Sequence, residues 1–214
     1  MPHPTNTLSG DTSLVLPEFD TPPADPIGLL RSWLDSAVER AVRESHAVVL
    51  ATADAEGQPS TRVLLVKELD ARGLVFTSFT GSRKGRDLAV RPSASMTFYW
   101  RETLQQITVA GPVETLSAAD SDRLFAERPL AARATTAVSR QSRPLESEAD
   151  LKDRAGALVA AGGPVDRPGE WSGYRLVPEV VEFWYGSPDR LHRRLRYELS
   201  ADEPAGWRWA RLQP

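Results

Sequence analysis

Residues 46–79 have the sequence HAVVLATADAEGQPSTRVLLVKELDARGLVFTSF, in which three short apolar runs alternate with two turns. The runs cover 46–54, 61–69 and 74–79, and the turns cover 55–58 and 70–73. Each turn contains a glycine and lies between residues typical of strands, which is the pattern of a β-hairpin. This stretch therefore predicts three consecutive antiparallel strands.

The flanking sequence adds further short strands and several helices. Asp25 and Pro26 suit the N-cap and first position of a helix, and apolar residues then recur every three to four positions up to Ala41. Trp33 belongs to this apolar stripe and is predicted to pack in the core. Further strands are predicted at 94–100, 105–116, 174–177, 180–184, 191–199 and 207–212, and helical segments at 82–90, 117–127 and within 128–172.

These elements predict a mainly β fold with helices (β+α), namely an antiparallel barrel with inserted helices. Residues 1–26 are rich in Pro, Thr and Asp and are predicted to form an extended N-terminal arm. Residues 27–214 contain no internal repeat and no linker, so a single domain is expected.

Composition excludes several classes of function. The 214 residues are 41% apolar and 26% charged, and the formal net charge is -3, which gives no electrostatic basis for binding nucleic acid. No apolar run approaches the roughly 20 residues that span a bilayer, and the first residues do not look like a secretion signal, so a cytoplasmic protein is expected. There is no cysteine, and three histidines show no metal-ligand spacing. Redox chemistry would therefore need a bound organic cofactor.

The most informative local motif is RLHRRLR (190–196). On a strand, Arg190, His192, Arg194 and Arg196 would share one face. Arginines bind phosphate or carboxylate groups bidentately, and a histidine among them can donate or relay a proton. A solvated cationic strand edge, which discourages aggregation, explains the same pattern equally well.

Three further motifs are weaker. The GSRK sequence (81–84) opens a helix and suits either a phosphate or a solvated helix start. Arg62 and Lys67 are five residues apart, so they either face opposite sides of a strand, are re-aimed by a bulge, or face water at the strand ends. The glutamines at 105–106 and 141 could bind a heterocycle or a phosphate, and Trp184 is on composition more typical of a core residue.

Taken together and in order, these motifs resemble the pyridoxamine 5′-phosphate oxidase superfamily. The matching segments are RVLLVK (62–67), FTS (76–78), SRKGRDLA (82–89), QITVAG (106–111), RQS (140–142), YRLVPEVVEFWYG (174–186), RLHRRLRY (190–197) and WARLQP (209–214). Members of this superfamily bind FMN at the interface of a homodimer. The resemblance thus implies an FMN-binding split β-barrel and a homodimer with FMN at the interface.

The resemblance also implies the residues of the site. The FMN shell would comprise Arg62, Val63, Leu64, Leu65, Val66, Lys67, Thr77, Ser78, Arg83, Lys84, Gln106, Gln141, Ser142, Trp184 and Arg194. The catalytic residues, over the flavin face, would be His192 and Arg190. Substrate would be bound by Lys67, Arg128, Arg190 and His192, and no metal is implied.

Departures from the family pattern bear on the substrate. Vitamin B6 phosphate oxidases clamp the substrate phosphate with a tyrosine, an arginine and a serine. Here Arg128 is retained, but Leu124 and Ala132 occupy the two hydroxyl positions, and Gln105 replaces an arginine that usually precedes the FMN glutamine. Each unpaired buried polar group costs about 1–3 kcal/mol, so a vitamin B6 phosphate is expected to fit poorly.

The same departures, together with N-terminal segments such as PPADP (22–26), resemble the phenazine-biosynthesis branch, the PhzG-type oxidases. This branch implies FMN-dependent oxidation of reduced (hexahydro- or tetrahydro-) phenazine carboxylates towards phenazine-1-carboxylic or phenazine-1,6-dicarboxylic acid, with O2 as acceptor. Two alternatives stay open: a pyridoxine/pyridoxamine 5′-phosphate oxidase, and a flavin-binding protein of this fold without catalytic activity.

Overall fold

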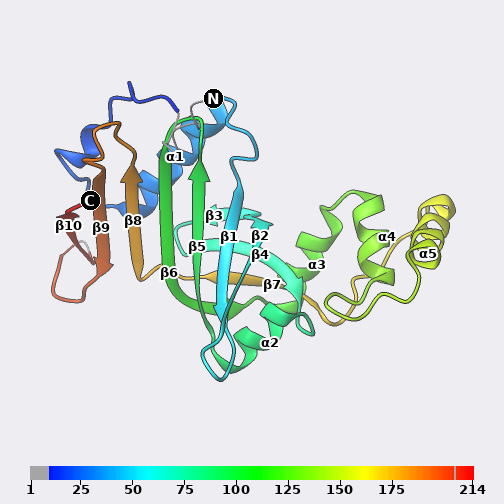
Figure 1. The fold of residues 1–214 in the computed structure, drawn as a ribbon. Helices are drawn as coiled ribbons and strands as arrows, with labels where there is room; N and C mark the ends of the chain where they lie inside the picture. The colour runs from blue at the N-terminus through cyan, green and yellow to red at the C-terminus, as the bar shows by residue number, and fades with distance from the viewer. Residues whose placement is uncertain (1–9, 205) are drawn as a thin grey trace.

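The computed structural model describes residues 10–204 and 206–214 and shows a curled antiparallel sheet with helices at its margins (Figure 1). The strands are β1 (Ala47–Ala53), β2 (Pro59–Leu65), β3 (Glu68–Asp70), β4 (Gly73–Phe79), β5 (Ser93–Trp100), β6 (Gln105–Thr115), β7 (Trp171–Leu176), β8 (Val180–Tyr185), β9 (Arg193–Leu199) and β10 (Trp207–Leu212). The helices are α1 (Pro26–Glu39), α2 (Arg83–Val90), α3 (Ala118–Ala126), α4 (Leu130–Val138) and α5 (Glu148–Ala161). The predicted fold class, mainly β with inserted helices, is confirmed.

The long strand β6 joins two parts of the sheet. One path runs β10-β9-β8-β6-β5-β1-β2, and a branch at the far end of β6 runs through β7 and β4 to β3. Gly111 lies in β6 between its pairing with β8 and its pairing with β7. A Cβ at Gly111 would lie 2.0 Å from the carbonyl oxygen of Val177, so only glycine allows this close approach. This crossing closes the sheet into a barrel that is split along one side.

The predicted 61–69 strand is two strands in the structure. β2 ends at Leu65, and the backbone N–H of Val66 donates to His46 on the β1 side, whereas that of Lys67 donates to Val75 of β4. The chain therefore leaves one part of the sheet and enters the other between these two residues. This change of sheet, and no bulge, separates Arg62 from Lys67.

Helix α1 closes one end of the core. Asp25 caps it, accepting from the N–H of Ile27 at 2.9 Å, and Pro26 occupies its first turn as predicted. Trp33 is 3% exposed and packs edge-on against Phe183 of β8, with 5.1 Å between ring centroids. The prediction that Trp33 belongs to the core is confirmed.

The described part of the N-terminal arm is packed on the barrel. Residues 17–19 form a turn of 3-10 helix, Phe19 is buried, and the carboxylate of Glu18 accepts from the indole N–H of Trp33. Arg193 lies over the ring of Phe19 and pairs with Asp20 at 2.6 Å. An extended arm was predicted for 1–26; of these residues, 1–9 lie outside the described part, and 17–19 are helical because Phe19 and Glu18 find partners in the core.

Helices α3, α4 and α5 form an excursion that projects from the barrel (Figure 1). Leu124 and Phe125 of α3 pack with Val75, Phe79 and Trp171 in a second, small apolar cluster. Helix α5 buries none of its residues against the chain. Among the described residues, no helix is both long and apolar enough to cross a membrane.

Candidate functional site

The first part of the site lies where β4 leads into α2. Ser82 caps α2: its hydroxyl accepts from the N–H of Gly85 at 3.2 Å and donates to the carbonyl of Phe79 at 2.8 Å. A Cβ at Gly85 would lie 2.3 Å from the carbonyl oxygen of Thr80, so glycine lets the first turn of α2 lie directly on the end of β4. This packing places Arg83 and Lys84 beside Thr77 and Ser78.

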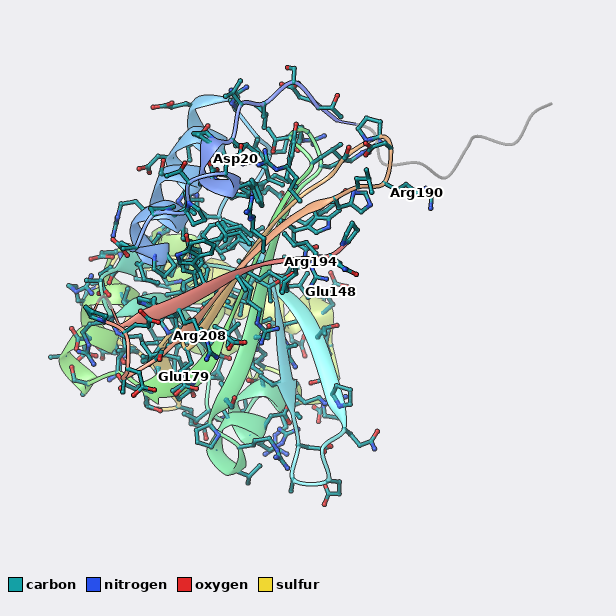
Figure 2. All side chains as sticks on the ribbon, turned by 90° about the vertical axis from the view of Figure 1, so that its left-hand side faces the viewer. Asp20, Glu148, Glu179, Arg190, Arg194 and Arg208 are labelled. Carbon is teal, nitrogen blue, oxygen red and sulfur yellow. The ribbon has the colours of Figure 1, made fainter. Side chains whose placement is uncertain are left out.

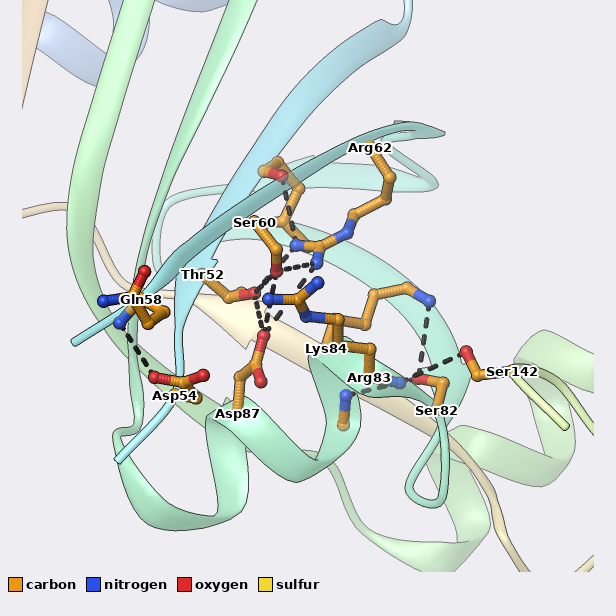
Figure 3. A network of polar contacts seen from close by, with 12 residues as sticks. Thr52, Asp54, Gln58, Ser60, Arg62, Ser82, Arg83, Lys84, Asp87 and Ser142 are labelled. Carbon is orange, nitrogen blue, oxygen red and sulfur yellow. Dashed lines mark hydrogen bonds and ion pairs between the residues drawn. The ribbon is translucent and has the colours of Figure 1, made fainter. Parts of the chain in front are cut away.

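Arg62 reaches the same place from β2. Its guanidinium donates to Thr52 Oγ1 at 2.8 Å, to Ser60 Oγ at 2.6 Å and to the carbonyl of Leu50 at 3.2 Å. The carboxylate of Asp87 on α2 accepts from the same Thr52 hydroxyl at 2.6 Å and from Ser60 at 3.1 Å (Figure 3). The Arg62 and Asp87 side chains are 3.9 Å apart at their closest nitrogen and oxygen.

Gln141 and Ser142 close this cluster from the loop after α4. Gln141 Oε1 accepts from Lys84 Nζ at 3.3 Å and lies 3.4 Å from the Ser78 hydroxyl. The Ser142 hydroxyl accepts from the N–H of Arg83 at 3.3 Å. Residues distant in sequence thus converge on the start of α2.

The electrostatics of this cluster favour an anion. Burial, and then the positive charge of Arg62, lower the pKa of Lys84 to about 8, although Asp87 acts in the opposite direction. Burial also lowers the pKa of Arg62, with Arg83 adding to the effect and Asp87 opposing it. The cluster therefore has a net positive charge, since three cations, Arg62, Arg83 and Lys84, are balanced only by the carboxylate of Asp87. A bound dianion would relieve their mutual repulsion.

A cavity of about 400 Å³ opens at this cluster. It is lined by Ser60, Thr61, Arg62, Val63, Leu64, Thr77, Arg83, Lys84, Gln141 and Ser142. Eight of these ten residues, all except Ser60 and Thr61, belong to the FMN shell predicted from sequence. Cationic side chains, hydroxyls and the N-terminus of a helix suit the phosphate of FMN, so the residues present fit this cofactor.

Three other predicted FMN residues lie elsewhere, in one row across the open face of the sheet. Gln106 on β6 pairs in register with Trp184 on β8, and Trp184 pairs with Arg194 on β9. Trp184 is half-buried on this face and lies beside the ring of His192, so the expectation from composition that it is a core residue is wrong. Arg194 donates to Glu182 at 2.8 Å and to the carbonyl of Gln213 at 3.1 Å.

Arg62 and the row of Gln106, Trp184 and Arg194 are on opposite faces of the sheet, and the first cavity extends to both faces of the end strand β2 because Arg62 and Val63 both line it. Arg62 leaves β2 on the side of buried Leu50, whereas Val63 lies in the open face, in register with Val49 and Thr97. Four strand spacings separate β2 from β8, which amounts to about 19 Å along the sheet. One chain therefore does not bring both sets onto a single small ligand.

The open face itself is partly apolar. Val49, Val63, Leu65 and Tyr99 are between 41% and 67% exposed there. β2 is also an end strand of its sheet path, so one side of its backbone is available for hydrogen bonds within the described structure. Exposed apolar patches of this kind mark interaction surfaces.

Arg190 and His192 lie in a loop and not on the predicted strand. β9 begins only at Arg193, Arg190 has a positive φ of 66°, and Leu191 is 68% exposed. The carboxylate of Asp189 organises this loop by accepting from the Ser187 hydroxyl and from the N–H of Leu191. Such local carboxylate bonds replace the strand ladder here. Figure 2 shows Arg190 at the tip of the loop, away from Arg194.

The loop also fixes the tautomer of His192. The backbone N–H of Ser187 donates to Nδ1 of His192 at 3.0 Å. Because a backbone nitrogen can only donate, Nδ1 accepts, and the ring proton of neutral His192 is on Nε2. His192 therefore presents an N–H donor on the side of the ring away from the loop.

Arg128 faces a second, larger cavity of about 1210 Å³, which shares Thr77 and Gln141 with the first. Its guanidinium lies 5.3 Å from the ring centroid of Trp171 and donates to the Thr136 hydroxyl at 2.7 Å. Burial lowers its pKa. Because the two cavities adjoin, a cation in the second one is suited to pair with the carboxylate of a substrate that lies beside a ligand in the first.

The two positions at which vitamin B6 phosphate oxidases have hydroxyl side chains, Leu124 and Ala132, differ in burial. Leu124 is 4% exposed and packs against Gly173 and the second apolar cluster, and it does not line the cavity that contains Arg128. The sequence-based interpretation of Leu124 as a wall of the substrate pocket therefore needs this correction: α3 turns it into the core. Ala132 is half-buried on α4, one turn from Thr136.

The remaining predicted residues are dispersed. Val66 is in the core, Lys67 and Leu65 are exposed, and Ser78 is mostly buried at the wall of the second cavity. Sequence reasoning missed Thr52, Ser60 and Asp87, which hold Arg62. Asp87 lies within the matching segment SRKGRDLA, three residues after Lys84. Residues at this spacing are neighbours on a helix, so the sequence could have indicated that Asp87 lies near the predicted phosphate-binding residues.

Comparisons with known proteins agree with this geometry. Residues 34–160 match the family model "Pyridoxamine 5′-phosphate oxidase", and residues 171–214 match "Pyridoxine 5′-phosphate oxidase C-terminal dimerisation region". A dihydrophenazinedicarboxylate synthase of Pseudomonas chlororaphis is 40% identical over 98% of this chain and 93% of its own. A pyridoxine/pyridoxamine 5′-phosphate oxidase of Burkholderia multivorans is 44% identical over 93% of each chain.

Among solved structures, PhzG from Burkholderia lata in complex with tetrahydrophenazine-1-carboxylic acid superposes with a TM-score of 0.91. It is 41% identical and covers 96% of this chain and 100% of its own. This likeness confirms the predicted split-barrel fold.

Proposed function

The chain belongs to the pyridoxamine 5′-phosphate oxidase family, a family of oxidoreductases, and we propose that it is an FMN-dependent oxidase of phenazine biosynthesis. Its proposed substrates are reduced phenazine carboxylates, with O2 as the electron acceptor. The observation that carries this proposal is the 400 Å³ cavity lined by eight predicted FMN residues, next to the cavity that contains Arg128.

The residues of the first cavity are proposed to hold FMN. Arg62, Arg83 and Lys84 supply charge to its phosphate, and Gln141 and Ser142 supply hydrogen bonds. When bound, FMN supplies the redox chemistry, taking up a hydride equivalent from the substrate and returning the electrons to O2. The protein contributes binding, orientation and charge.

A homodimer is proposed because the site is incomplete in one chain. Gln106, Trp184 and Arg194 lie on the open face, opposite in direction to Arg62, and Trp184 on β8 is about 19 Å from β2 along the sheet. A second copy packed on the open face would bring its own row to the first cavity, with FMN at the interface. The match of residues 171–214 to a dimerisation region supports this arrangement, since it includes β8, β9 and β10.

The substrate is proposed to be oriented by Arg190, His192, Arg128 and Lys67. Arg190 is exposed at a loop tip and would bind a carboxylate, and the Nε2–H of His192 would donate a hydrogen bond to the substrate. Formation of an aromatic ring drives the oxidation, so no strong general base is needed.

A pyridoxine/pyridoxamine 5′-phosphate oxidase is the second candidate. The 44% identity to such an oxidase and the retained Arg128 favour it. Overall identity does not separate the two branches, since the phenazine relatives are 40% and 41% identical. The missing hydroxyl at Ala132 supports the phenazine assignment, because a bound phosphate would lose a donor there, whereas Leu124 is turned into the core and does not bear on this choice.

Side-by-side turnover of the two substrates tests the proposal. The purified protein should release FMN on heating, and tetrahydrophenazine-1-carboxylic acid should bleach the bound flavin anaerobically and consume oxygen in air. Pyridoxine 5′-phosphate should do so much more slowly. Fast oxidation of pyridoxine 5′-phosphate with no phenazine oxidation would select the second candidate, and bound FMN that neither substrate reduces would indicate a flavin-binding protein without catalysis.

A further inference from the structure

Asp87 is the one carboxylate in the cationic cluster at the start of α2, and it is not among the site residues predicted from sequence. It is 4% exposed, and it reaches the cluster from the same helix that presents Arg83 and Lys84. Its side chain lies at the junction of β1, β2 and α2, because its two hydrogen-bond partners are Thr52 of β1 and Ser60 of β2.

The direction of the hydrogen bonds follows from chemistry. An ionised carboxylate can only accept, so the hydroxyls of Thr52 and Ser60 both donate to Asp87. Each hydroxyl has one hydrogen, and that hydrogen is used in the bond to Asp87. Each hydroxyl oxygen can therefore only accept a hydrogen bond from any further partner. The guanidinium of Arg62 can only donate, and it donates to those same two oxygens.

Asp87 thus determines where Arg62 points. With both hydroxyl hydrogens turned towards the carboxylate, two acceptors face the guanidinium at 2.8 Å and 2.6 Å, and the Leu50 carbonyl is a third at 3.2 Å. These contacts hold Arg62 at the wall of the 400 Å³ cavity, beside Lys84 and Arg83. These contacts offset the rotamer entropy that a long arginine side chain loses when it is fixed in one orientation.

We infer that Asp87 is a positioning residue for the flavin phosphate: through the hydroxyls of Thr52 and Ser60 it holds the Arg62 guanidinium in its phosphate-binding orientation. This inference rests on the proposed FMN site. A competing effect exists, since a carboxylate near a phosphate repels it. Arg62 lines the cavity and Asp87 does not, so a bound phosphate would be nearer to the cation than to the carboxylate, and the effect on the orientation of Arg62 outweighs the repulsion.

Asp87→Asn tests the inference. The amide places N–H groups where the carboxylate accepted, so it competes with Arg62 for the lone pairs of Thr52 and Ser60. Apoprotein titrated with FMN should show an affinity about 2- to 10-fold weaker than wild type, the range of one lost ordinary hydrogen bond. Riboflavin, which has the ring without the phosphate, should bind both proteins equally. Asp54→Asn, a matched loss of charge at the β1–β2 turn, should leave both affinities unchanged.

A double-variant cycle separates positioning from general damage to the fold. Without the Arg62 guanidinium, Asp87→Asn should weaken FMN binding no further, so Arg62→Met and Arg62→Met with Asp87→Asn should bind FMN equally. An FMN affinity in Asp87→Asn that equals or exceeds that of wild type overturns the inference, as does a parallel loss for riboflavin or an undiminished effect of Asp87→Asn in the Arg62→Met background. Wild-type protein that fails to bind FMN would instead refute the proposed function.

Discussion

FMN binding should weaken as the pH rises above 8, because of Lys84. Burial and Arg62 lower the pKa of this side chain to about 8 in the ligand-free protein. A phosphate dianion next to the ammonium group favours the charged form and restores a pKa near the usual value for lysine, about 10.4. Binding above pH 8 must therefore take up a proton, so the affinity is complete below pH 8 and falls as the pH rises through it.

The size of the effect follows from this difference in pKa. The dissociation constant should rise about tenfold between pH 7 and pH 9, and by about another tenfold per pH unit until the pKa of the bound state is reached. The second ionisation of the phosphate, with a pKa of about 6, is complete throughout and does not contribute. The cause is local, since the charged groups that face Lys84 are Arg62 and Asp87.

Titration of apoprotein with FMN at pH 7, 8 and 9, followed by quenching of flavin fluorescence, measures this slope. Riboflavin is the control for titration of the ring or of the rest of the protein, and its affinity should stay constant. Lys84→Arg keeps its charge over this range, so its FMN affinity should also be independent of pH. An equal FMN affinity at pH 7 and pH 9 in the wild type would refute the assignment of Lys84 to the phosphate.

Three further predictions concern assembly, catalysis and stability. Val49→Asp puts a charge in the open face and should convert a dimer into monomers in sedimentation, with loss of FMN, whereas the same change at Val90, exposed at the end of α2, should not. Arg190→Ala should lower kcat/KM for a phenazine carboxylate about 10- to 150-fold, the loss of about 1.5–3 kcal/mol, and unchanged kinetics would remove Arg190 from the site. Leu124→Tyr with Ala132→Ser should lower the free energy of unfolding by about 1–3 kcal/mol, because Leu124 is 4% exposed against Gly173; a thermal melt equal to wild type would contradict this placement.

Most of the local structure could be predicted from sequence. The two hairpin turns, the cap at Asp25, and the stripe that contains Trp33 all appear in the structure where they were expected. Each depends on residues a few positions apart, whose hydrogen bonds and periodicity act within one element. The ordered family motifs also indicated most residues that line the 400 Å³ cavity.

The predictions that failed were those that extended a local pattern across a boundary. The 190–199 segment alternates like a strand, but Asp189 folds its first residues into a loop that turns Arg190 to a positive φ. Leu124 occupies a motif position of the substrate site, but α3 rotates it into the core. Neither local carboxylate bonds nor the rotation of a helix is visible in alternation or in motif order.

By itself, then, the sequence determined the elements, their approximate limits, the family and the residue types of the site. Only the tertiary structure decided which of those residues meet. It put Arg62 and the row of Gln106, Trp184 and Arg194 on opposite faces of one sheet, and it brought Asp87 to Arg62 from 25 positions further along the chain. The reason is that such contacts arise from strand pairing and helix packing between distant segments, and their geometry depends on the whole barrel and not on any one stretch of it.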